Sequence, residues 1–164
     1  MKKVTGDIWL SDPQQRAWRA FIGMQARLRA SIARQLQRES GLSEADYEVL
    51  VNLSEADGQR LRAYQLGAST GWEKSRLSHH LTRMEGRGLV RREPCAHDPR
   101  YADVILTEAG RSAIQDAAPR HVAHVRQWFV DAMTPDQLDA FATACEAVLA
   151  KLDADGTDPC GADC

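Results

Sequence analysis

The sequence has no apolar stretch long enough to cross a membrane, and aromatic residues make up only 6% of its 164 residues. A membrane-spanning helix needs about 20 consecutive apolar residues, so we expect no contact with a membrane. No apolar run follows Lys2 and Lys3 near the amino terminus, which argues against a secretion signal. We therefore expect a cytoplasmic protein whose other apolar residues suffice for a core.

The sequence also lacks the motifs that usually mark an enzyme. It contains no Gly-x-Ser-x-Gly elbow, phosphate-binding loop, dinucleotide fingerprint or zinc-protease motif. His121 and His124 have a spacing that can share a metal, but no obvious third ligand accompanies them. An enzyme of this sequence would have to be a metal hydrolase that adds Cys95 to the two histidines. We expect instead no enzymatic activity, no cofactor and no bound metal.

The four cysteines are expected to be free thiols rather than a disulfide framework. Cys145 lies on an apolar helical pattern and should be buried in the core. Cys95 should be exposed in a loop, whereas Cys160 and Cys164 belong to the C-terminal segment, where they could oxidise together. The sequence leaves open whether these last three thiols have a redox role.

The formal net charge of −2 lacks the positive excess of many nucleic-acid-binding proteins, but the charges are unevenly distributed. Residues 60–100 contain the basic residues Arg60, Arg62, Lys74, Arg76, Arg83, Arg87, Arg91, Arg92 and Arg100. The acids of that segment are Glu73, Glu85, Glu93 and Asp98. From Asp131 onward Lys151 is the single basic residue among many acids. This asymmetry would orient the protein on a polyanion such as DNA.

Apolar periodicities predict a mainly α-helical chain with a small β-hairpin. A first helix should span residues 12–38, and a second should begin at Ser43, whose side chain can cap it. Two further helices should begin at Thr107 and Thr134. Pro119 lies inside the first of these two and should kink or split it.

The segment between these helices predicts a helix-turn-helix followed by a β-hairpin wing. The expected elements are a one-residue strand at Leu61, a helix over 62–69, a turn at Thr70-Gly71, a helix over 73–85, and strands over 89–93 and 102–106. Pro94 and Pro99 break the polar stretch between the two strands, which should therefore be an exposed loop.

The helix over 73–85 has an unusual polar face. Leu77, Leu81 and Met84 share the side that should be buried, and His80 lies near them as a packing residue. The remaining side chains offer hydroxyls, an imidazole, an ammonium and guanidinium groups, which can bond phosphates and base edges. They are Lys74, Ser75, Arg76, Ser78, His79, Thr82 and Arg83. A charged helix face is often merely solvated, but this one is followed by further motifs.

Four motifs follow one another in this part of the chain. They are the run over 72–88, Leu89-Val90-Arg91-Arg92, His97-Asp98-Pro99-Arg100 and Leu106-Thr107-Glu108-Ala109-Gly110. Together they resemble the MarR family of bacterial transcriptional regulators, and the similarity extends over about residues 18–152. In that family the arginine that matches Arg100 reaches into the minor groove of DNA, and the aspartate that matches Asp98 holds the wing in shape. An arginine at a loop tip is also attracted by the strong negative potential of a narrow groove.

The resemblance implies a winged helix-turn-helix over 42–106 and a dimerisation domain formed by the helices of 1–41 and 107–152. The small, polar and acidic residues 153–164 should form a disordered tail. The apolar faces of the end helices exceed what one winged helix can cover, which also favours a homodimer. Two identical heads would bind a pseudo-palindrome in double-stranded DNA, with half-sites about 10 base pairs apart.

Members of the family often bind small, frequently phenolic anions between the dimerisation helices and the winged helix. The candidates for such a pocket are Trp18, Phe21, Arg27, Tyr47 and His121, although aromatic residues of this kind are more often part of a core. The main hypothesis is a DNA-binding repressor that a small molecule releases. The alternatives are a thiol- or metal-responsive regulator of the same fold and a winged helix that only docks other proteins.

Overall fold

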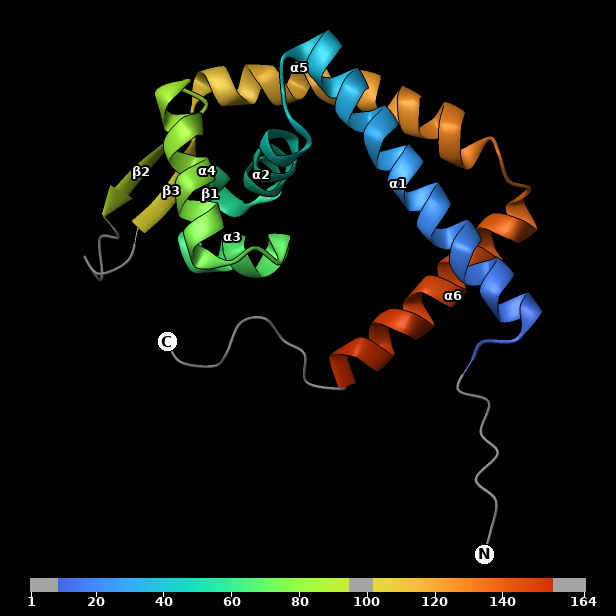
Figure 1. Ribbon diagram of the computed structural model, residues 1–164. Helices are drawn as coiled ribbons and strands as arrows, with labels where there is room; N and C mark the ends of the chain where they lie inside the picture. The colour runs from blue at the N-terminus through green and yellow to red at the C-terminus, as the bar shows by residue number, and fades with distance from the viewer. Residues whose placement is uncertain (1–8, 95–101, 155–164) are drawn as a thin grey trace, which may run out of the picture.

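The computed structural model describes residues 9–94 and 102–154 (Figure 1). Its elements are α1 (Asp12–Ser40), α2 (Glu44–Glu55), the 3-10 turn η1 (Asp57–Gln59), β1 (Arg60–Arg62), α3 (Ala63–Thr70), α4 (Lys74–Gly86), β2 (Val90–Pro94), β3 (Ala102–Leu106), α5 (Glu108–Val125), the π-helical turn η2 (Arg126–Val130) and α6 (Pro135–Ala154). The predicted class, mainly α with a small sheet, is confirmed. None of the described helices is long and apolar enough to cross a membrane.

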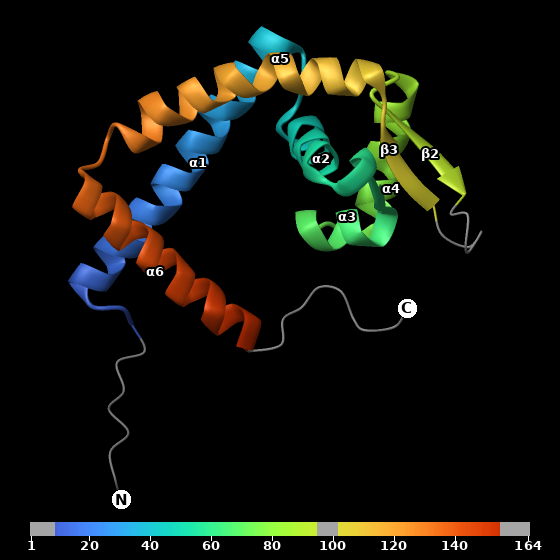
Figure 2. The same cartoon turned by 180° about the vertical axis from the view of Figure 1, so that it is seen from behind.

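The three strands form an antiparallel sheet in the order β1-β3-β2. Val104 at the centre of β3 pairs with Leu61 on one side and with Arg92 on the other. The predicted pairing of Leu61 with the hairpin is therefore confirmed, as part of a three-residue strand. Figure 2 shows that the sheet and helices α2, α3 and α4 gather at one end of the molecule.

The hydrophobic core lies within this end of the molecule. Its fully buried side chains include Leu50 and Leu53 of α2, Leu66 of α3, and Leu81 and Met84 of α4. The beginning of α5 closes the core, since Ile114 and Ala117 are buried against it. The apolar side of α4 is thus fixed by packing on two other helices and the sheet, and its opposite side must face outward.

Helices α1, α5 and α6 extend away from the sheet (Figure 1). Helix α1 packs against α5, where Ser31 Oγ lies 3.0 Å from His124 Nε2. Helix α1 ends at Gly41, which has a φ of 65° and donates its amide hydrogen to the carbonyl of Gln37. A glycine adopts this left-handed conformation without steric cost, so the chain can turn there into α2.

Pro119 was predicted to kink or split its helix, and the structure shows that it does not split it. Helix α5 continues through Pro119 to Val125, and the π-helical turn η2 begins seven residues after the proline, at Arg126. Proline lacks the amide hydrogen that would bond the carbonyl four residues earlier, that of Gln115. Both Pro119 and Gln115 are exposed, so water can satisfy that carbonyl and the helix tolerates the missing bond.

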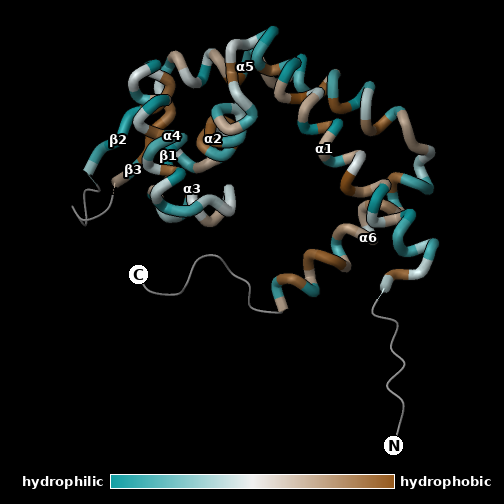
Figure 3. The backbone as a smooth tube through the Cα atoms, in the orientation of Figure 1, coloured by the Kyte–Doolittle hydropathy of each residue, from teal (hydrophilic) through white to brown (hydrophobic). Residues whose placement is uncertain are grey.

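Apolar side chains remain exposed along the end helices of the single chain. Figure 3 shows hydrophobic segments on α6, and this helix contains no buried residue. Val148, Leu149 and Leu152 are 60%, 57% and 52% exposed. Cys145, on the same helix, is only half-buried, so the prediction that it lies in the core is wrong. Its apolar helical pattern is real, but the described residues of one chain cover that face of α6 only in part.

Candidate nucleic-acid interface

The face of α4 that points away from the core carries the predicted polar residues. Leu77, His80, Leu81 and Met84 are buried on the inner side. The exposed residues are Lys74, Ser75, Arg76, Ser78, His79, Thr82 and Arg83. None of these carries a carboxylate, so the exposed face offers hydrogen-bond donors and positive charge to a ligand.

The start of α4 is held by an aromatic contact. Gly71, with a φ of 66°, ends α3, and Trp72 packs partly buried against the core. The guanidinium carbon of Arg76 lies 4.4 Å from the centre of the Trp72 ring, within the range of a cation–π interaction. Arg76 therefore extends toward Trp72, at the edge of the exposed face rather than at its centre.

The far end of α4 is tied to the wing by a salt bridge. Arg92 of β2 donates from Nε to Glu85 at 2.8 Å, and its backbone amide donates to the same carboxylate at 2.8 Å. These bonds from Arg92 lower the pKa of Glu85. Arg92 Nη2 also donates to Thr82 Oγ1 at 3.1 Å, while that hydroxyl donates to the carbonyl of Ser78. The Thr82 hydroxyl thus already has two partners within the chain, whereas its residue as a whole stays exposed.

A buried carboxylate joins α2 to α4. Asp46, only 3% exposed, completes the predicted capping box at Ser43 and accepts a hydrogen bond from Arg87 Nη1 at 2.7 Å. His80 Nε2 lies 3.1 Å from the other carboxylate oxygen of Asp46. Burial alone would raise the pKa of Asp46, but the bonds from Ser43 and Arg87 outweigh it, so the pKa is lowered. Asp46 is therefore ionised, and it fixes the position of α4 from beneath.

The tip of the wing lies outside the described residues. The predicted contacts at Asp98 and Arg100 belong to that segment, so their roles remain predictions. On the wing strands next to that segment, Arg91 Nη1 lies 2.9 Å from Glu93. Arg60 of β1 lies 3.7 Å from Glu93 and 3.9 Å from Asp103. The acids of the two wing strands are thus compensated by arginines, which limits their repulsion of phosphate.

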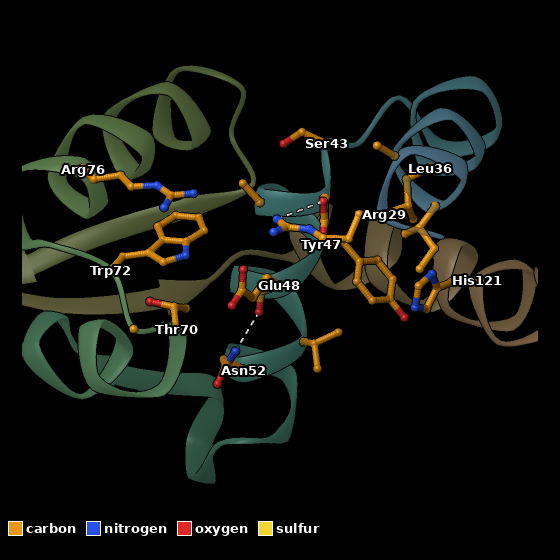
Figure 4. A pocket seen from close by; sticks show the side chains of 16 residues that line it. Arg29, Leu36, Ser43, Tyr47, Glu48, Asn52, Thr70, Trp72, Arg76 and His121 are labelled. Carbon is orange, nitrogen blue, oxygen red and sulfur yellow. Dashed lines mark hydrogen bonds and ion pairs between the residues drawn. The ribbon is translucent and has the colours of Figure 1, made fainter. Parts of the chain in front are cut away.

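A hollow of about 950 Å³ lies between α1, α2, the start of α4 and α5. Figure 4 shows Trp72 and Arg76 on one side of it and Tyr47 and His121 on the other. The Tyr47 and His121 rings are 4.4 Å apart, and Arg29 Nε donates to Glu44 at 3.1 Å. Of the predicted ligand residues, the structure brings Tyr47 and His121 to this hollow. Trp18, Phe21 and Arg27 are exposed on the first half of α1 and are not among its lining residues.

The hollow contains polar groups whose protonation depends on burial. Burial raises the pKa of Glu48, and Glu44 adds to that effect, while Arg76 and Arg29 oppose it. Burial also lowers the pKa of His121, so that its ring is neutral. The Nδ1 atom of His121 is buried and has no hydrogen-bond partner in the part of the chain that the structure describes. Such an atom can bond a polar group of a ligand.

Sequence reasoning missed Arg29, Glu48 and Asp46 as parts of these sites. Asp46 lies in the cap that begins at Ser43, and that local pattern does not reveal its ion pair with Arg87, which is 41 residues away. Arg29 and Glu48 carried no local signal, because their meeting at the hollow depends on how α1 packs against α2. Among the described residues, no group of three histidine, cysteine, aspartate or glutamate side chains could hold a metal ion.

Comparison with known proteins identifies the family. A model described as MarR family matches residues 40–100. The structure of AbsC, a MarR family transcriptional regulator from Streptomyces coelicolor, is 42% identical in sequence with a TM-score of 0.85. The match covers 89% of this chain and 98% of AbsC. The chain belongs to the MarR family.

Two further solved structures of MarR family regulators are similar to this MarR-family protein. Sco3205 from Streptomyces coelicolor, a MarR family regulator in complex with DNA, is 38% identical with a TM-score of 0.84. That match covers 88% of this chain and 94% of Sco3205. A MarR family regulator from Silicibacter pomeroyi is 30% identical, covers 83% of this chain and 89% of its own, and has a TM-score of 0.65. A family of transcriptional regulators is consistent with the expectation that this protein is not an enzyme.

Proposed function

We propose that this MarR-family protein is a transcriptional repressor that binds a pseudo-palindromic operator as a homodimer and is released by a small-molecule ligand. The observation that carries the DNA-binding part is the exposed face of α4. That face presents donors and positive charge without a carboxylate, and its orientation is fixed by the core beneath it. A helix of this kind on a helix-turn-helix fits the major groove of DNA. The related Sco3205 was solved in complex with DNA, which supports the same role here.

The homodimer is supported by the exposed apolar residues of the end helices. Trp18 and Phe21 on α1 and Leu149 on α6 are 56%, 40% and 57% exposed in the single chain. A soluble protein rarely leaves so many large apolar side chains in water unless a partner covers them. A second copy of the chain is the simplest partner, because two copies would also supply two recognition helices.

The ligand-release part is supported by the hollow beside α4. Arg76 lines that hollow and also belongs to the exposed face of α4. An anion bound near Arg76 would therefore compete with DNA for the same guanidinium. A ligand shifts the protein away from DNA only by its difference in affinity for the two states, so this competition gives a physical reason for release.

The first test is equilibrium binding to genomic duplexes that the protein itself enriches, measured by fluorescence anisotropy over a range of salt concentrations. We expect the affinity to fall steeply with salt, because each neutralised phosphate releases counterions.

Arg100→Ala should weaken binding by about 10-fold or more, as expected for a groove contact. The matched control is Arg19→Ala, on the exposed first half of α1, which should bind like the parent. A DNA affinity that does not change with salt concentration would instead indicate a protein-docking module.

The same assay tests release by a small molecule, with salicylate as the probe. Salicylate should lower the affinity of the parent for DNA. Tyr47→Phe should need a different salicylate concentration for half-release while keeping its DNA affinity, since Tyr47 lines the hollow and does not belong to α4. If salicylate changes neither protein, phenolic anions are not the ligand class.

A further inference from the structure

His80 is a titratable side chain buried between α4 and α2, and its two ring nitrogens meet groups of opposite charge. The residue is 6% exposed. Its Nε2 lies 3.1 Å from the Oδ1 atom of Asp46, and its Nδ1 lies 3.1 Å from the Nη2 atom of Arg83. Asp46 belongs to the buried base of α4, whereas Arg83 belongs to the exposed face of that helix.

These neighbours determine which nitrogen carries the proton. Asp46 is ionised, because its Oδ2 accepts from Arg87 at 2.7 Å and from the Ser43 backbone at 2.9 Å. A carboxylate beside Nε2 repels a bare lone pair and attracts an N–H, so the proton belongs on Nε2. Among the described residues Nε2 has no other polar neighbour within bonding distance, so the Asp46 carboxylate is the group that attracts this N–H. Nδ1 is then bare and can accept from Arg83.

The contact between Arg83 and Nδ1 depends on whether His80 is neutral or charged. The guanidinium of Arg83 stays protonated and can only donate. It can therefore bond Nδ1 of a neutral imidazole but not of an imidazolium, in which both nitrogens carry protons. Protonation would add a positive charge within 3.1 Å of Arg83 and would at the same time strengthen the pairing with Asp46.

We infer that His80 is a positioning residue for DNA binding: its neutral ring holds the Arg83 guanidinium in place on the exposed face of α4, and its protonated ring releases it. This role rests on the proposed function, because it needs Arg83 to contact DNA. An arginine that is already held in one position loses less conformational freedom when it binds a phosphate or a base. His80 thereby acts on the interface without touching DNA.

The charged groups around His80 decide the direction of the pH effect. Asp46 faces it from α2, Arg76 and Arg83 face it from its own helix, and the Trp72 ring meets it edge-on at 5.3 Å between ring centres. Burial lowers the pKa of His80, Asp46 opposes that effect, and the two arginines lower the pKa again. The ring is thus neutral at neutral pH. Affinity for DNA should be full above the pKa of His80 and should fall as the pH drops through it.

The test uses two amide variants that each keep one half of the ring. His80→Asn keeps an oxygen acceptor near the position of Nδ1, and His80→Gln keeps an N–H donor near the position of Nε2. Neither amide titrates. All proteins carry His79→Gln, because His79 is exposed on the same face and its own protonation would otherwise affect binding. Affinity for the enriched duplex is measured from about pH 8 to about pH 5, the range in which histidines titrate.

We expect His80→Asn to bind like its parent at the upper pH and to keep its affinity as the pH falls. His80→Gln should bind roughly 3- to 10-fold more weakly for each recognition helix at every pH, the worth of one hydrogen bond. As the pH falls, the DNA affinity of the parent should decrease toward that of His80→Gln. In an Arg83→Ala background, His80→Gln should lower the DNA affinity no further, because the guanidinium that His80 positions is absent.

Two results would overturn the inference: equal losses for His80→Asn and His80→Gln, or a loss for His80→Gln that persists in the Arg83→Ala background. Either would mean that His80 only supports the fold. Thermal unfolding of each variant at each pH shows whether the proteins compared are folded. Absence of salt-dependent DNA binding by the unsubstituted protein at the upper pH would instead reject the proposed function itself, so the two failures are distinguishable.

Discussion

At the residue scale, Gly110 is a position where α5 lies against the backbone of Leu89, just before β2. A Cβ atom added there would lie 2.1 Å from the carbonyl oxygen of Leu89 and 2.8 Å from a methyl carbon of Leu106. The first of these atoms belongs to the backbone and cannot rotate away. The sequence placed this glycine in a helix after the second wing strand, but only the packing explains why no larger residue fits.

We predict that Gly110→Ala lowers the free energy of unfolding by about 1–3 kcal/mol, the usual cost of overpacking a core. The matched control is Gly86→Ala, at the end of α4, where an added Cβ meets nothing within 4 Å. That variant should be neutral or more stable by up to about 1 kcal/mol, since alanine favours helices over glycine. Urea unfolding followed by circular dichroism measures both, and equal stabilities would contradict the packing argument.

At the element scale, helix caps were readable from the sequence, whereas the contacts that some caps make with distant strands were not. Thr107 was predicted to cap its helix, and its hydroxyl accepts from the amide of Gly110 at 3.0 Å. The same hydroxyl donates to the carbonyl of Gly88 at 2.6 Å. One side chain thus begins α5 and also fixes the turn that leads from α4 into β2.

We predict that Thr107→Ala costs about 1–2 kcal/mol of unfolding free energy, at the upper end of measured cap losses, because it breaks both bonds. Thr134→Ala is the matched control. Its hydroxyl accepts from Gln137 at 3.3 Å at the start of α6, a helix with no buried residue in the single chain. It should cost less than about 1 kcal/mol. Urea unfolding measures the free energy of unfolding of both variants. A larger decrease for Thr134→Ala than for Thr107→Ala would show that the link to Gly88 is unimportant.

At the scale of the whole molecule, the end helices carry an apolar surface that a single chain leaves uncovered. The ring of Phe129 in η2 meets that of Phe141 in α6 at 5.5 Å, but Val148, Leu149 and Leu152 farther along α6 remain exposed. The sequence analysis expected the apolar faces of the end helices to exceed what one winged helix can cover, and in one chain these side chains are indeed exposed. A homodimer built from these helices would cover them.

We predict that Leu149→Glu weakens the homodimer about 30-fold or more, because it places a charge in the centre of the proposed interface. Sedimentation velocity should show monomers at concentrations at which the parent is dimeric. The affinity for a full operator should fall as well, because the two winged helices are no longer joined in one molecule that binds both half-sites together. The control is Glu146→Gln, also exposed on α6. An unchanged dimer of Leu149→Glu would move the interface to another face.

The sequence by itself determined the order and type of the elements, most of their ends, and the outward face of α4. These features depend on local patterns: helical and strand periodicity, capping residues such as Ser43 and Thr107, and glycine at the turns. It did not tell whether Pro119 would split its helix, which continues because its exposed side tolerates the missing bond, and it wrongly placed Cys145 in the core, where one chain buries it only in part.

Only the tertiary structure decided which distant side chains meet. Asp46 reaches His80 and Arg87 because α2 crosses beneath α4, and Arg29 reaches the hollow because α1 packs over α2. Local sequence patterns carry no information on such meetings, since they depend on how helices cross rather than on spacing along one helix. The arrangement by which a buried carboxylate and a neutral imidazole hold Arg83 is therefore a property of the packed fold.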